Sequence, residues 1–111
     1  MSSLAEKMRL ARQETIEVGT HKFIVRRPTD QEALELGSAS LVDVAVRFVI
    51  GWEGVTELDL FPGGTGQSVK FDPDAWQEWC ADRPDFWEPI SSAVLLAYKR
   101  HREAKDEAVK N

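Results

Sequence analysis

The sequence has few of the residues that form disulfides, bind metals or act as nucleophiles. It contains one cysteine, Cys80, and two histidines, His21 and His101. A single cysteine cannot form an internal disulfide, and it fits a reducing compartment such as the cytoplasm. No two of these three side chains stand at the spacing of metal ligands, so we expect no metal site and no bound cofactor.

Long apolar runs and an excess of positive charge are also missing. The longest apolar stretch, Leu41 to Ile50, is interrupted by Asp43 and Arg47 and is too short to cross a bilayer. The chain has 14 basic and 19 acidic residues, for a net charge of −5. The cationic cluster at 99–102 is followed by acidic residues, which is typical of a solvated helix face. We therefore expect neither a membrane nor a nucleic-acid partner.

Motifs for catalysis are absent as well, and each residue that could imitate one has a structural explanation. Cys80 follows Trp79 in a tryptophan-rich segment, where a buried and inert thiol is the usual outcome. The glycine-rich stretch 62–66 lacks the lysine that follows a phosphate-binding loop. Asp72 and Asp74 are explained by helix capping. The sequence therefore predicts no catalytic residues and no enzymatic activity.

With 111 residues, the chain fits a single domain over 1–111 that can bury a substantial core. Residues 1–13 carry apolar side chains on one helical face and predict a short amphipathic helix. Residues 14–27 alternate apolar and polar side chains around a turn at Gly19, which predicts a β-hairpin. Because an isolated hairpin is barely stable, its apolar face must pack on the helices that follow.

Residues 29–50 predict a helical core. Thr29 and Glu32 stand three apart, which is the spacing of a capping box, and Ser40 can cap a second helix. A buried strand would use the same β-branched residues as this second segment. The acid and the arginine within it stand four apart, however, and this spacing favours a helix.

The second half of the chain divides into a loop and further helices. Residues 51–71 hold five glycines and predict a long glycine-rich loop. Residues 72–111 predict C-terminal helices, the first capped by Asp72 ahead of a proline and the second by Asp85 with Glu88. The expected fold is therefore mainly α with a small N-terminal β-hairpin, an α+β domain of four to five helices with a long C-terminal helix.

Tryptophan is abundant, with four residues in this short chain. Large amphipathic aromatic side chains are enriched in protein interfaces, so these rings are candidates for a partner-binding surface. Packing of the same rings in the core is the alternative, and we favour it slightly. The candidate partner-binding residues are Trp52, Trp76, Trp79, Phe86 and Trp87.

Three short segments, in this order, resemble the tail assembly chaperones of long-tailed, siphovirus-type bacteriophages. They are Phe23 to Asp30 ahead of an alanine- and leucine-rich helix, Phe48 to Val55, and Val69 to Asp72 opening a helix. The resemblance rests chiefly on Gly51-Trp52-Glu53-Gly54-Val55 and extends from Thr15 to the C-terminus. The family has no catalytic motif.

The resemblance implies a small helical protein of the host bacterial cytoplasm that coats the tape measure protein, recruits tail tube subunits and leaves the finished virion. It also implies weak self-association into a homo-oligomer, and in some members a longer frameshifted form. One alternative is another morphogenesis component, such as a head-tail connector or neck protein retained in the virion. A further alternative is a small enzyme or regulator that uses Cys80 and a histidine.

Overall fold

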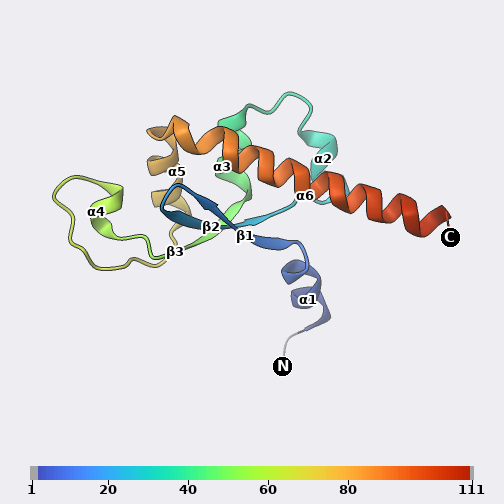
Figure 1. The fold of residues 1–111 in the computed structure, drawn as a ribbon, viewed down its shortest axis with the longest axis horizontal. Helices are drawn as coiled ribbons and strands as arrows, with labels where there is room; N and C mark the ends of the chain where they lie inside the picture. The colour runs from blue at the N-terminus through green and yellow to red at the C-terminus, as the bar shows by residue number, and fades with distance from the viewer. Residues whose placement is uncertain (1–2, 111) are drawn as a thin grey trace.

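The computed structural model describes residues 3–110 and shows a mixed α+β fold (Figure 1). The helices are α1 (Leu4–Leu10), α2 (Asp30–Glu35), α3 (Leu41–Phe48), α4 (Glu57–Leu60), α5 (Pro73–Ala81) and α6 (Pro84–Lys110), and the strands are β1 (Gln13–Val18), β2 (His21–Arg26) and β3 (Val49–Glu53). The predicted fold class, with an N-terminal hairpin and a long C-terminal helix, is confirmed. Residues 1, 2 and 111 of the expected terminal helices lie outside the described residues.

The predicted hairpin is the first part of a larger sheet. β1 and β2 pair antiparallel, and β2 pairs antiparallel with β3 to give the strand order β1-β2-β3. The hairpin turn holds Gly19 at φ 61°, a left-handed conformation that glycine adopts without steric cost. The third strand corrects the prediction that the helical core continues to residue 50. Val49 and Ile50 are β-branched residues of β3, and this strand pairs with β2, which would otherwise have an unpaired edge. Val49 pairs with Val25, and Ile50 lies where the register shifts between Ile24 and Val25.

Most of the predicted helix starts are confirmed. Thr29 and Ser40 each form a capping box, with Glu32 and Asp43 as the reciprocal partners. Asp72 caps α5, which has proline at its first position. The predicted cap at Asp85 is wrong, because α6 already begins at Pro84 and Asp85 lies in its first turn.

The segment predicted as a loop over residues 51–71 contains regular structure. It includes most of β3 and the short helix α4, which has its own capping box between Thr56 and Asp59. A backbone bridge joins Thr56 to Ser68 across the segment. Gly64 lies so close to the backbone of Glu57 that a Cβ built on it would be 2.6 Å from the Glu57 carbonyl oxygen. Backbone amides of Glu57, Leu58 and Val69 donate to the carbonyls of Gln67, Thr65 and Val55, respectively, and hold this glycine-rich segment in a defined shape.

The core lies where α3, α5 and α6 meet the sheet. α6 packs along α3 and also contacts α5, β1 and β2. Fourteen apolar residues from these elements and the adjoining segments form one buried cluster, which consists of Phe23, Val25, Val44, Ala45, Phe48, Val49, Trp52, Val55, Trp76, Trp79, Cys80, Phe86, Ile90 and Val94. The hairpin is thus stabilised by the helices that follow it, as its sequence required.

The C-terminal half of α6 extends past the sheet (Figure 1). Its 27 residues correspond to about 40 Å of helix. This half contacts Asp30 at the start of α2, through the Tyr98 hydroxyl at 3.0 Å, the Lys105 ammonium at 2.6 Å and the His101 ring at 3.3 Å. Among residues 3–110, no helix combines the length and apolarity needed to span a bilayer.

Candidate functional site

Four of the five aromatic residues predicted as a partner-binding surface lie in the core. Trp76 and Phe86 are each 1% exposed, and Trp52 and Trp79 are also buried. A buried ring cannot contact a partner while the core is intact, so the burial of these four residues agrees with the favoured alternative of core packing. Trp87 is only partly buried against the cluster and remains accessible at its edge.

The indole N–H groups explain why the core contains so many tryptophans. The Trp76 indole donates to the Ala45 carbonyl at 3.2 Å and joins α5 to α3. The Trp52 indole donates to the Val69 carbonyl at 2.9 Å, and the Trp87 indole donates to the Cys80 carbonyl at 2.7 Å. Each bond gives the indole N–H an acceptor inside the folded protein. Trp76 and Trp52 therefore connect segments that are distant in sequence, and Trp87 connects the adjacent helices α5 and α6.

Cys80 and the two histidines lie in different parts of the fold and have different contacts. Cys80 is fully buried, and burial raises the pKa of its thiol to about 11. His21 lies 3.6 Å from Asp59 and packs edge-on against Trp79, whereas His101 lies beside Asp30 on α2. A buried thiol of raised pKa is a poor nucleophile. Within residues 3–110, no group of three or more histidine, cysteine or acidic side chains could hold a metal ion.

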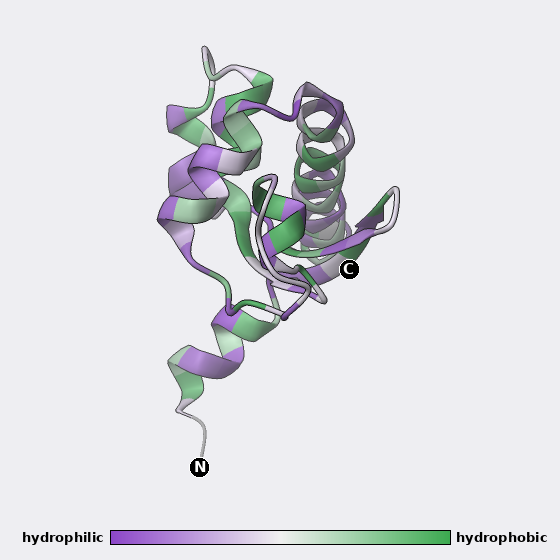
Figure 2. Ribbon diagram, turned by 90° about the vertical axis from the view of Figure 1, so that its left-hand side faces the viewer, coloured by the Kyte–Doolittle hydropathy of each residue, from purple (hydrophilic) through white to green (hydrophobic). Residues whose placement is uncertain are grey.

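α1 projects away from the body of the protein, with hydrophobic and hydrophilic residues on the same short helix (Figures 1 and 2). None of its residues is buried. Leu4 is 76% exposed, Met8 is 54% exposed and Leu10 is 59% exposed. Leu4 and Met8 stand four residues apart and so lie on the same helical face. α1 therefore offers an apolar face that the described part of the chain leaves uncovered.

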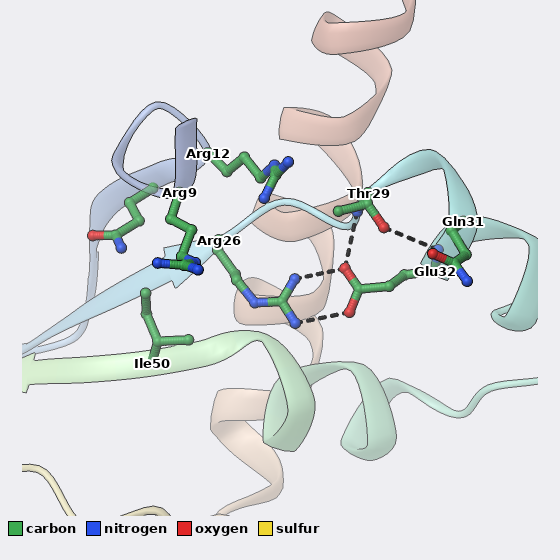
Figure 3. A pocket seen from close by; sticks show the side chains of 8 residues that line it. Arg9, Arg12, Arg26, Thr29, Gln31, Glu32 and Ile50 are labelled. Carbon is green, nitrogen blue, oxygen red and sulfur yellow. Dashed lines mark hydrogen bonds and ion pairs between the residues drawn. The ribbon is translucent and has the colours of Figure 1, made fainter. Parts of the chain in front are cut away.

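A cavity of about 540 Å³ lies between α1, the end of β2 and the start of α2 (Figure 3). Three arginines line it from different segments: Arg9 on α1, Arg12 between α1 and β1, and Arg26 at the end of β2. The remaining lining residues are Gln13, Thr29, Gln31, Glu32 and Ile50. We call the three arginines and the cavity they line the arginine pocket.

Glu32 is the acidic residue that lines this pocket, and its carboxylate already accepts several hydrogen bonds. It accepts two hydrogen bonds from Arg26 at 2.7 and 2.8 Å, one from the Thr29 backbone at 3.0 Å and one from Arg47 at 3.2 Å. The hydrogen bonds from Arg26, together with the Thr29 amide and the Arg47 charge, lower the pKa of Glu32 to about 2. Glu32 is therefore ionised at neutral pH and joins β2, α2 and α3.

No family model, curated protein or solved structure matches the chain. The assignment of a function therefore rests on the residues and contacts described above.

Sequence reasoning did not find the arginine pocket. Its members come from three segments, and Arg26 pairs directly with Gln13 of β1 in the hairpin register. The Arg27 amide donates to the Arg12 carbonyl at 2.9 Å. This hydrogen bond holds the segment after α1 next to the end of β2. The proximity of Arg12 to Arg26 follows from strand pairing and could have been read from a correct hairpin register. The position of Arg9 depends on how α1 joins the sheet.

Proposed function

We propose that this protein is a tail assembly chaperone of long-tailed bacteriophages, which binds the tape measure protein and helps to recruit tail tube subunits. In this proposal it acts by binding alone, in the host bacterial cytoplasm, and is absent from the mature virion. The order of short segments that resembles this family supports the proposal. The observation that carries it is the uncovered apolar face of α1.

The chemistry of α1 suits a long helical partner. Its face presents Leu4 and Met8, each more than half exposed, on a helix that stands clear of the core. A tape measure protein is a long helical chain whose apolar stripes would aggregate if left bare. An amphipathic helix can cover such a stripe by laying its own apolar side chains against it. Burying both side chains would contribute about 2–4 kcal/mol per copy before the costs of ordering.

Co-expression with a fragment of the tape measure protein tests the proposal. The wild-type chain is expected to keep the fragment in the soluble fraction, and the variant Leu4→Ser/Met8→Ser is expected to lose at least about half of this effect, because the apolar contact is gone. Leu34→Ser is the matched control, since Leu34 is 87% exposed but lies on α2. An equal loss in the control, or no solubilisation by the wild type, would refute the proposal.

Two further measurements distinguish this function from a structural role in the particle. A chaperone that coats one long chain in many copies contacts itself, so sedimentation is expected to reveal weak, concentration-dependent oligomers. Mass spectrometry of purified virions is expected to find the tape measure protein without this chain. Its presence there at stoichiometric amounts would instead identify a head-tail connector or neck protein.

A further inference from the structure

The arginine pocket carries a local positive charge in an acidic protein. Three arginines and one glutamate line it, which gives it a formal charge of +2, whereas the whole chain has a net charge of −5. In Figure 3 the three arginine side chains approach the same space from α1, the following segment and β2. Like charges that converge in this way repel one another unless an anion lies between them.

Glu32 does not neutralise all three arginines. Its carboxylate accepts hydrogen bonds from the guanidinium groups of Arg26 and Arg47 and from the Thr29 amide. Among residues 3–110, no ion pair or side-chain hydrogen bond joins the guanidinium of Arg9 or Arg12 to an acidic group. Arg12 is partly buried, so this unpaired charge is held partly away from water. Two guanidinium groups therefore remain available to an incoming anion.

The positive charge of Arg12 also affects the pKa of its neighbour Arg27. Burial lowers the pKa of Arg27, and the charge of Arg12 lowers it further. The positive charge of Arg12 therefore also acts on Arg27. An anion bound beside Arg12 would relieve this repulsion as well as pairing with the guanidinium itself.

We propose that the arginine pocket binds a carboxylate-rich segment of a partner polypeptide, with Arg9 and Arg12 as the binding groups and Arg26 as part of the wall. The planar guanidinium fork matches a carboxylate, and the Arg26 pair with Glu32 already displays that match within the pocket. The pocket wall includes Ile50, so a peptide can bury an apolar side chain there. A nucleotide fits less well, because no aromatic side chain among residues 3–110 lines the pocket to stack a base.

This site is independent of which protein supplies the acidic segment, so it can be tested apart from the proposed function. The probe is a fluorescein-labelled hexaglutamate peptide, and its binding to the full chain is followed by fluorescence anisotropy at about 50 mM salt, where charge interactions are weakly screened. The test variant is Arg9→Gln/Arg12→Gln. The control, Lys7→Gln/Arg100→Gln, also removes two positive charges, but from positions on α1 and α6 outside the pocket. Circular dichroism checks that both variants are folded.

The pocket variant is expected to bind hexaglutamate about tenfold more weakly than the wild type, while the control stays within about twofold. Equal weakening in both variants would overturn the proposal, because it would mean that the peptide responds only to overall charge. Absence of binding to the wild type would overturn it as well. Displacement of the peptide by about 1 mM inorganic phosphate would reassign the pocket to a small inorganic anion. None of these outcomes depends on the solubilisation of a tape measure fragment.

Discussion

Replacing Glu32 with glutamine should destabilise the fold and strengthen the binding of acidic peptides. The carboxylate joins Arg26 on β2 to Arg47 on α3 while it closes the capping box of α2. Charge-assisted hydrogen bonds contribute about 1.5–3 kcal/mol each when buried, and exposed pairs contribute about 0–1 kcal/mol. The side chains of Glu32, Arg26 and Arg47 are 18%, 27% and 41% exposed. We therefore expect Glu32→Gln to lower the free energy of unfolding by about 1–2 kcal/mol.

Urea unfolding at pH 7 measures this loss, and Glu35→Gln on the same helix is the matched control. Glu35 contacts Arg47 at 3.1 Å but is 56% exposed, so its loss should stay below about 0.5 kcal/mol. The same Glu32→Gln substitution raises the formal charge of the arginine pocket, and hexaglutamate should bind to it more tightly than to the wild type. If both substitutions had equal effects on stability, the assignment of Glu32 as the central link would be wrong.

The dependence on pH follows from the pKa of Glu32. The hydrogen bonds from Arg26 lower this pKa from 4.5 to about 2, so the folded state holds the charged form more strongly than the unfolded chain does. The stabilisation is therefore fully present above about pH 4.5 and is lost as the pH falls toward 2. The stability gap between wild type and Glu32→Gln should be constant from pH 6 to 8 and should close on acidification. A gap that persists at about pH 2 would contradict this explanation.

Three other substitutions or reagents test separate parts of the structure. Gly64→Ala should cost about 1–3 kcal/mol in urea unfolding, because its Cβ would meet the Glu57 backbone at 2.6 Å, whereas Gly66→Ala has open space and should be neutral. Ser91→Ala should raise stability by about 0.5–1 kcal/mol, since its buried hydroxyl finds no hydrogen-bond partner among residues 3–110; a loss of stability would reveal a partner. Cys80 should react with iodoacetamide at least about 100-fold more slowly in the native protein than in denaturant, and fast native labelling would contradict its burial.

Local signals predicted the helix starts well, because a cap depends on residues only two or three positions apart. Thr29, Ser40 and Asp72 each cap the helix that the sequence indicated. The same reasoning failed at Asp85. Proline is favoured at the first position of a helix, and α6 begins at Pro84, so Asp85 lies inside the first turn and does not cap it. The short helix α4 was missed, since its capping pair lies inside a segment dominated by glycine.

The third strand shows the limit of pattern reading within a short apolar run. Val49 and Ile50 follow directly on α3, and a run of β-branched residues serves a helix or a buried strand equally well. β2 decides between the two, because its outer edge accepts the pairing that begins at Val49. That pairing joins residues 24 to 31 positions apart in the chain, so a pattern of neighbouring residues cannot predict it.

The sequence by itself determined the class of the fold, the position of most helix ends and the presence of enough aromatic residues to build a core. These properties depend on composition and on spacings of a few residues. Only the tertiary structure decided that the tryptophans are internal connectors, that α1 stands uncovered and that Arg9, Arg12 and Arg26 converge. Burial and convergence depend on contacts between segments that are distant in the chain. Such contacts form only when the whole chain has packed, so the spacing of neighbouring residues cannot predict them.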